Sequence, residues 1–309
     1  MVIELLLGGI NMDANHEYQR WLSLVKEQDL IDDLEKIKDD EQEILDRFHQ
    51  PLSFGTAGMR GVLAMGTNRM NRYTVGRATQ GLSDYLNEIT DEGSVAIAYD
   101  SRHQSKEFAE ETAAILAANG IKAYLYDRLM PVPMGSFAIR ELKCSAGVVI
   151  TASHNPSVYN GYKVYGPDGC QMTDDAANAV LEKIDSHDYF SGVNSISFEE
   201  GLNNGSIEYI SDEVINRYYD NVLQQRQSPE APSASPIRIV YTPLNGAGNE
   251  PVRKVLQMAG HNDVIVVPVH RFHDALRAIA SAIGDFIFRP FNIPFVHSSL
   301  IICELSGLI

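Results

Sequence analysis

The region from residue 72 to residue 150 alternates helical segments with short apolar strands. Helices are expected at 72–90, 105–119 and 134–142, and each is followed by one of the strands SVAIAYD, IKAYLYD and SAGVVI. This spacing is typical of crossover units, which place parallel strands side by side and helices over the faces of the sheet. We therefore predict an α/β fold, with a mixed, mostly parallel sheet covered by helices in three layers (αβα).

The segment after residue 150 departs from this alternation. Asn160-Gly161 and Pro167-Asp168-Gly169 are tight-turn signals on either side of YKVY, so an antiparallel ribbon is expected at the sheet edge. A helix is expected at 174–185, and the polar residues 186–212 are expected to be irregular. Beyond a Pro/Ser-rich connector, IRIVYTPLNGAGNEPVRKVLQMAG again has the order strand, Gly-rich loop and helix, which predicts a second, incomplete α/β domain.

These patterns divide the chain into four predicted parts. Residues 1–50 form a helical N-terminal extension, because apolar residues such as Trp21 recur at helical intervals between charges. The first α/β domain is expected at 51–204 and the start of the second at 205–270, with a helix near 211–225 between them. The tail at 271–309 holds only three of the 41 acidic residues, so we expect it to be divergent, through truncation or a changed reading frame.

The charge balance limits the partners of the chain. Its 41 Asp and Glu residues outnumber its 25 Lys and Arg residues, and the net charge of −16 repels phosphate backbones and anionic membranes. We therefore expect neither nucleic acid nor a membrane as a partner. Three widely spaced cysteines, a short apolar N-terminal run and the lack of a long apolar stretch predict a cytoplasmic protein. The sequence predicts no particular oligomeric state.

A serine stands just beyond the apolar strand that ends at Ile150. Asn155-Pro156 ends the extended run, because proline cannot donate a ladder hydrogen bond, and Ser153 is left on a tight turn. Ligands of open α/β sheets bind outside the carboxyl ends of the strands. The Ser153 hydroxyl could therefore be a nucleophile, a phosphate carrier or only a turn residue. A serine hydrolase is not favoured, because the chain lacks a G-x-S-x-G elbow.

Four motifs resemble those of the α-D-phosphohexomutases, the phosphoglucomutase and phosphomannomutase superfamily. TASHNP at 151–156 resembles the phosphoserine loop of this family, and FGTAGMRG at 54–61 resembles its N-terminal arginine loop in the branch with phosphopentomutase-like enzymes. YNGYKVYGPDG at 159–169 is similar to its lysine-bearing ribbon, and YTPLNGAG at 241–248 to the start of its second domain. The resemblance covers roughly residues 15–270, the N-terminal part of such a protein.

The resemblance implies a role for each matching residue. Ser153 would carry the phosphoryl group, Arg60 would neutralise its charge, and Lys163 would act as an acid and base. His154 would hold the surroundings of the phosphoserine, with an ordinary turn histidine as the alternative. Helix capping or another structural role is the alternative for Arg102 and His103. The residues expected to bind phosphate or substrate are Thr56, Arg60, Arg102, His103, Ser153 and Asn155.

The implied activity is interconversion of a sugar 1-phosphate and a sugar 6-phosphate through phosphoserine. Glucose is expected as the sugar before mannose or a pentose, the partner is a small-molecule phosphosugar, and glucose 1,6-bisphosphate is the activator. The family binds Mg²⁺ through the phosphate on serine, here Ser153, and three aspartates of a D-x-D-x-D-R loop. This chain contains no D-x-D, so impaired activity is expected. The alternative is a non-catalytic fragment that binds phosphosugars or a partner protein.

Overall fold

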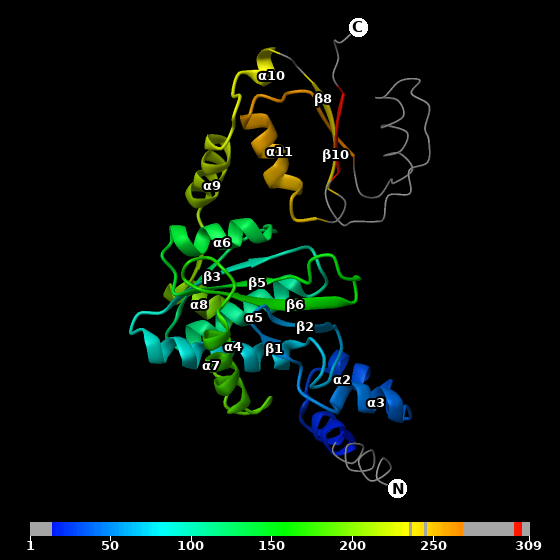
Figure 1. Cartoon of the computed structure of the whole chain (residues 1–309). Coiled ribbons are helices and arrows are strands. Elements are labelled where there is room, and N and C mark those ends of the chain that lie inside the picture. The colour runs from blue at the N-terminus through cyan, green and yellow to red at the C-terminus, as the bar shows by residue number, and fades with distance from the viewer. Residues whose placement is uncertain (1–13, 235–236, 244–245, 268–299, 305–309) are drawn as a thin grey trace.

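The computed structural model describes residues 14–234, 237–243, 246–267 and 300–304, the last of these as backbone (Figure 1). These residues form a seven-stranded sheet and a three-stranded sheet. Of the tail that the sequence sets apart at 271–309, only 300–304 lie within the described residues. The predicted divergence of the rest lies outside them.

The larger sheet has the strand order β1-β2-β6-β5-β3-β4-β7. Strands β5, β3, β4 and β7 are parallel, whereas β6 is antiparallel to both β5 and β2, and β1 is antiparallel to β2. The sheet is therefore mixed, as predicted. The strand bounds are β1 Phe54–Gly55, β2 Gly58–Val62, β3 Ser94–Tyr99, β4 Lys122–Leu125, β5 Ala146–Ile150, β6 Tyr159–Tyr165 and β7 Ile207–Tyr209.

Helices cover both faces of this sheet, which confirms the predicted three layers. One core contains apolar side chains of α4, α5 and α7 together with alternate strand residues such as Val148 and Ile150. The opposite core contains α6 and α9 together with the other strand residues, such as Val149. Figure 1 shows α6 on one side of the strands and α4, α5 and α7 on the other. The bounds are α4 Arg72–Ile89, α5 Ser105–Ala118, α6 Val132–Glu141, α7 Asp174–Asp185 and α9 Asp212–Gln224.

The N-terminal extension is helical, as its periodicity predicts. Residues 14–24 are helical, and α2 (Gln28–Glu35) and α3 (Glu41–Phe48) follow. Trp21 is fully buried, and its ring contacts aromatic rings of α3, of the start of α4 and of the segment after α7. This aromatic cluster is therefore one of the contacts that attach the extension to the first sheet domain.

The expected edge ribbon is wrong in one respect. Asn160-Gly161 is not a turn but lies inside β6, and β2 and β1 continue the sheet beyond it. The Asn160 side chain is buried and donates hydrogen bonds to the His103 carbonyl and the Ser105 hydroxyl, so it is satisfied within the sheet. A Cβ at Gly161 would lie 2.6 Å from the Thr151 carbonyl oxygen, so glycine permits a close backbone approach here.

The other turn signal is confirmed. Gly169 has φ +76°, in the left-handed region that glycine adopts without strain. The Gly166 amide donates to the Cys170 carbonyl, and Tyr165 and Gln171 form an isolated antiparallel bridge. The chain therefore reverses at Pro167-Asp168-Gly169, as the residue types predict.

The segment expected to be irregular before residue 212 contains two short elements. Helix α8 (Phe198–Asn204) begins at Ser197, whose hydroxyl accepts the Glu200 amide, and β7 extends the sheet by pairing with β4 in parallel. Both elements are too short to show a clear period in the sequence. The first sheet thus extends to residue 209, beyond the expected boundary near 205. The division into domains itself stays a prediction.

A smaller α/β unit follows α9. Strands β8 (Arg238–Thr242) and β9 (Val264–Val266) are parallel and are connected through α11 (Asn249–Met258), and β10 (Leu300–Glu304) is antiparallel to β8. The short helix α10 (Ala231–Ala234) precedes β8. Helix α9 contacts both α6 and α11, and Arg128 forms ion pairs with Asp212 and Glu250 across this junction. Within the described ranges, no helix is sufficiently long and apolar to cross a membrane.

Two glycines of α4 provide a matched test of the helix packing. A Cβ at Gly81 would lie 2.6 Å from the Ile184 backbone nitrogen in α7, whereas a Cβ at Gly76 would meet only side-chain atoms at 3.5 Å or more. We expect Gly81→Ala to lower the free energy of unfolding by about 1–3 kcal/mol, because the helices must separate. Gly76→Ala is expected to raise it by up to about 1 kcal/mol, because alanine favours the helix. Urea denaturation of both variants measures the difference, and equal effects would contradict the packing described above.

Candidate active site at the carboxyl end of β5

Ser153 lies on a strained turn directly after β5. Its φ is +56°, a left-handed conformation that costs a non-glycine residue about 1 kcal/mol or more. The Ser153 amide donates to Thr151 Oγ1 at 2.9 Å, and the Thr151 hydroxyl donates to Asp100 Oδ2 at 2.5 Å. The Ser153 side chain is exposed. The serine predicted as the phosphate carrier therefore has an accessible side chain, and its backbone is fixed by the hydrogen bond to Thr151, which is in turn bonded to Asp100.

Arg102 organises the same loop. Its Nη1 donates to the carbonyl oxygens of Pro156 and Tyr159, each at 2.9 Å. Its Nη2 donates to the carbonyl oxygens of Ser153 and Asn155 at 2.7 and 2.5 Å. The Arg102 side chain is only 12% exposed. Because four backbone carbonyls already occupy both terminal nitrogens, the geometry favours the structural alternative over direct phosphate binding.

Arg60 contributes a positive charge from the neighbouring strand. It lies in β2, its side chain is exposed, and its Nη1 donates to Asn155 Oδ1 at 3.1 Å. Arg60 pairs with Gly161 of β6, and residues paired across strands share a face of the sheet. Lys163 lies two positions further along β6 and therefore shares that face with Arg60. Two cationic side chains thus lie beside the serine loop.

Lys163 is half-buried, and its pKa is lowered from the ordinary value of 10.5. Burial is the main cause, because it disfavours the charged ammonium, and the nearby Arg60 charge lowers the pKa further. Asp100 opposes the shift by favouring the charged form. A lysine with a lowered pKa can exchange protons at neutral pH more readily than an ordinary surface lysine. This environment suits the acid and base role that the resemblance implies.

The remaining predicted site residues differ in how closely their side chains contact the serine loop. His154 is exposed, and its Nδ1 is 3.3 Å from Ser153 Oγ, a long hydrogen bond. Thr56 is half-buried in the turn between β1 and β2. His103 is exposed and uses its carbonyl oxygen to hold Asn160. Among the described residues, neither Thr56 nor His103 has a side-chain hydrogen bond to the serine loop.

Sequence reasoning missed two residues of the site, Asp100 and Thr151. Both follow the carboxyl ends of adjacent parallel strands, since Tyr99 of β3 pairs with Ile150 of β5. Asp100 Oδ1 also accepts the Ser105 hydroxyl and the Arg102 amide. The sequence did contain a signal for them, because each is a polar residue directly after a predicted parallel strand. The carboxyl ends of parallel strands meet at one edge of the sheet, where ligands bind.

The described residues do not fit a magnesium site. No group of three His, Cys, Asp or Glu residues in the described ranges is arranged to hold a metal ion. Asp100 is the carboxylate placed beneath the serine loop, and both of its oxygens already accept hydrogen bonds. A hard cation needs several free oxygen ligands. The family implies Mg²⁺ in general, but this part of the chain does not provide the set of ligands that the ion requires.

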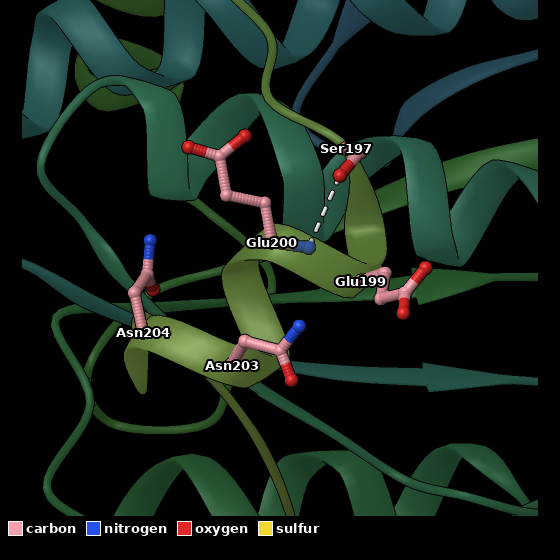
Figure 2. A pocket seen from close by; sticks show the side chains of 5 residues that line it. All are labelled: Ser197, Glu199, Glu200, Asn203 and Asn204. Atoms are coloured by element: carbon pink, nitrogen blue, oxygen red, sulfur yellow. Dashed lines mark hydrogen bonds between the residues drawn. The ribbon is translucent and has the colours of Figure 1, made fainter.

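A separate shallow pocket lies on α8 (Figure 2). Helix α8 packs against α5 and β7, and the pocket is not at the end of β5. Its lining includes two carboxylates, which repel a phosphate group, and the Ser197 hydroxyl is used to cap the helix. The lining residues are Ser197, Glu199, Glu200, Asn203 and Asn204. This pocket therefore does not suit a phosphosugar.

Comparisons with known proteins agree with the motifs. Residues 51–190 match the family model described as phosphoglucomutase/phosphomannomutase, alpha/beta/alpha domain I. The chain is 37% identical over 246 residues to a phosphoglucomutase of Staphylococcus saprophyticus, an alignment that covers 79% of this chain and 44% of the relative. It is 39% identical over 222 residues to a phosphoglucomutase of Staphylococcus haemolyticus, covering 71% of this chain and 39% of the relative. The chain thus spans less than half the length of these relatives.

A solved structure gives the same result for the fold. The chain superposes on a Thermus thermophilus protein described as a phosphomannomutase with a TM-score of 0.59 and 26% identity, covering 71% of this chain and 46% of that one. The matched family region contains Arg60, Ser153 and Lys163. Residues 51–190 therefore belong to the phosphoglucomutase/phosphomannomutase family of the α-D-phosphohexomutase superfamily, whose N-terminal part the chain resembles.

Proposed function

We propose that this chain carries the phosphoserine part of a phosphohexomutase that interconverts glucose 1-phosphate and glucose 6-phosphate. The observation that carries the proposal is the exposed Ser153 hydroxyl on a turn held in a left-handed conformation, beside the cationic Arg60 and Lys163. The phosphoglucomutase names of the Staphylococcus relatives support glucose as the sugar. Mannose phosphate and pentose phosphate remain the alternative substrates, and magnesium dependence and a cytoplasmic location remain predictions.

The proposed chemistry is a transfer of one phosphoryl group. Ser153 Oγ forms a bond to the phosphorus of glucose 1,6-bisphosphate, and the bond between that phosphorus and the sugar oxygen breaks. The neutral Lys163 amine accepts the hydroxyl proton of Ser153 and then gives this proton to the departing sugar oxygen, so that the products are phosphoserine and a glucose monophosphate. Arg60 balances the negative charge on the transferred group, and catalysis consists of positioning and charge neutralisation. The reverse transfer to the other sugar hydroxyl completes the interconversion.

A second candidate is a non-catalytic fragment that binds phosphosugars. It is favoured by one observation, that the described residues contain no cluster of metal ligands. The same loop would then recognise a phosphate group through Arg60 and the exposed Ser153 hydroxyl without forming a covalent bond. Covalent labelling of the serine distinguishes the two candidates.

Ser153 is expected to be the residue that accepts the phosphoryl group. Incubation of the purified chain with glucose 1,6-bisphosphate and magnesium is expected to add one phosphoryl group, which intact-mass spectrometry detects. Ser153→Ala is expected to gain none, because it lacks the accepting oxygen. Ser157→Ala removes another exposed hydroxyl of the same loop and serves as the matched control. An unmodified wild-type chain that still binds a phosphosugar would support the binding fragment instead.

The charge of Arg60 is expected to affect the rate of this phosphorylation. Arg60→Met is expected to slow phosphorylation of Ser153 by about 10²-fold, because a preorganised donor facing the transferred charge is lost. The rate is followed by intact mass at early times. Arg140→Met, which removes an arginine of α6, is the control for a general change in net charge and is expected to leave the rate unchanged. An equal effect of the two substitutions would argue against a local role.

The protonation of Lys163 is expected to depend on the charge of Arg60. Only the neutral amine reacts with an acylating reagent, so a lowered pKa moves the midpoint of its pH dependence below the ordinary value of 10.5. Arg60→Met is expected to move this midpoint upward, because the neighbouring positive charge is removed. Peptide mass spectrometry of the labelled lysine at a series of pH values measures both midpoints. A midpoint that does not respond to Arg60→Met would contradict the electrostatic coupling.

A further inference from the structure

The Asp100 carboxylate lies at the centre of the hydrogen bonds beneath the serine loop. Its Oδ1 accepts the Ser105 hydroxyl at 2.8 Å and the Arg102 amide at 3.0 Å. Its Oδ2 accepts the Thr151 hydroxyl at 2.5 Å and is 3.6 Å from Arg102 Nε. Asp100 is largely buried, with 18% of its side chain exposed. Its oxygens are therefore directed to protein donors.

The carboxylate determines the orientation of the Thr151 hydroxyl. An ionised carboxylate can only accept hydrogen bonds, so the single hydroxyl proton of Thr151 must be directed to Asp100. The lone pairs of Thr151 Oγ1 are then available, and one of them accepts the Ser153 amide. This bond holds Ser153 at φ +56° and offsets the cost of that conformation. Thr151 is 4% exposed, so water does not readily replace the missing partner if the hydroxyl is removed.

The same carboxylate also holds the arginine that organises the loop. Arg102 is bound to Asp100 through its backbone amide and its Nε, and its terminal nitrogens hold the loop carbonyls. Asp100 thus acts on the serine loop by two routes, one through Thr151 and one through Arg102. A charge-assisted contact of this kind is stronger than one between neutral groups.

We infer that Asp100 and Thr151 form a positioning pair that holds Ser153 in the backbone conformation needed for phosphoryl transfer. The inference rests on the proposed function, but the two residues act through the loop and do not touch the substrate. A displacement of a reacting group by about 1 Å can cost about 10²-fold in rate. The pair therefore affects the rate of transfer and not the binding of the phosphosugar.

Substitutions at Thr151 test the pair. Thr151→Val keeps the shape of the side chain and removes the hydroxyl, whereas Thr151→Ser keeps the hydroxyl. We expect Thr151→Val to lower the maximal rate of Ser153 phosphorylation by glucose 1,6-bisphosphate by about 10²-fold. The half-saturating concentration is expected to change less than about twofold, because no substrate contact is lost. Thr151→Ser is expected to restore most of the rate, and Ser157→Ala is the control within the loop.

Substitution of the carboxylate tests the second half of the pair. Asp100→Asn replaces one of the two accepting oxygens with an NH₂ group, which cannot accept a hydrogen bond. Either the Thr151 hydroxyl or the Arg102 amide therefore loses its acceptor. The effect of Asp100→Asn on the maximal rate is expected to equal or exceed that of Thr151→Val, again with little change in the half-saturating concentration. The effects of the two substitutions are expected to be non-additive, since the two side chains are hydrogen-bonded to each other and act on the same loop.

Hydrogen exchange separates this inference from the proposed function. Peptides that cover residues 151–158 are expected to exchange their amide hydrogens faster in Thr151→Val and Asp100→Asn than in the wild type. The exchange rates of the other peptides are expected to stay unchanged. A wild type that takes no phosphoryl group would overturn the proposed function, and the exchange would still test the positioning. Wild-type rate and wild-type exchange in Thr151→Val would overturn the inference, as would a failure of Thr151→Ser to restore either.

Discussion

The antiparallel insertion of β6 between β5 and β2 is the constraint on which the candidate site depends. The pairing places Arg60 opposite Gly161, and Lys163 two positions further on the same face. Tyr162 points to the other face, where its hydroxyl is buried and accepts the hydrogen bond of the Thr79 hydroxyl. A shift of β6 by one residue would exchange the faces of its side chains, so that Lys163 would replace Tyr162 in the core and leave the face that carries Arg60. The buried tyrosine therefore specifies which side of the sheet carries the positive charge.

The N-terminal helices support the segment that leaves β2. Asp33 Oδ2 accepts the amide of Met65 and forms an ion pair with Arg47, whose backbone carbonyl accepts the Asn68 amide. Gly66 approaches Arg47 so closely that a Cβ there would lie 2.8 Å from its carbonyl oxygen. The extension thus holds the chain between β2 and α4 through partly buried polar contacts, and the strand that carries Arg60 is supported at one end.

Much of the fold follows from local patterns. The alternation of apolar strands and amphipathic helices predicted β3, β4, β5 and the helices between them, because each element buries one face with its own period. The prediction failed at Asn160-Gly161, where two turn-forming residues lie in a central strand. The Asn160 side chain contacts the backbone of His103, which is distant in sequence, and the lack of a side chain at Gly161 permits a close approach to the backbone of Thr151 in the neighbouring strand segment. The short elements α8 and β7 were missed because their stability comes from neighbours and not from a local period.

The sequence by itself determined where the candidate site lies: at a serine on a forced turn after a buried strand, in a motif shared with a known family. Only the tertiary structure decided the roles of the charged groups around it. Arg102 holds loop carbonyls, Asp100 orients Thr151, and Lys163 has a lowered pKa because it is buried near another cation. The physical reason is that strand ends and strand register bring these residues together from separate parts of the chain. Hydrogen bonding, burial and charge proximity are properties of that arrangement and are not contained in any local segment.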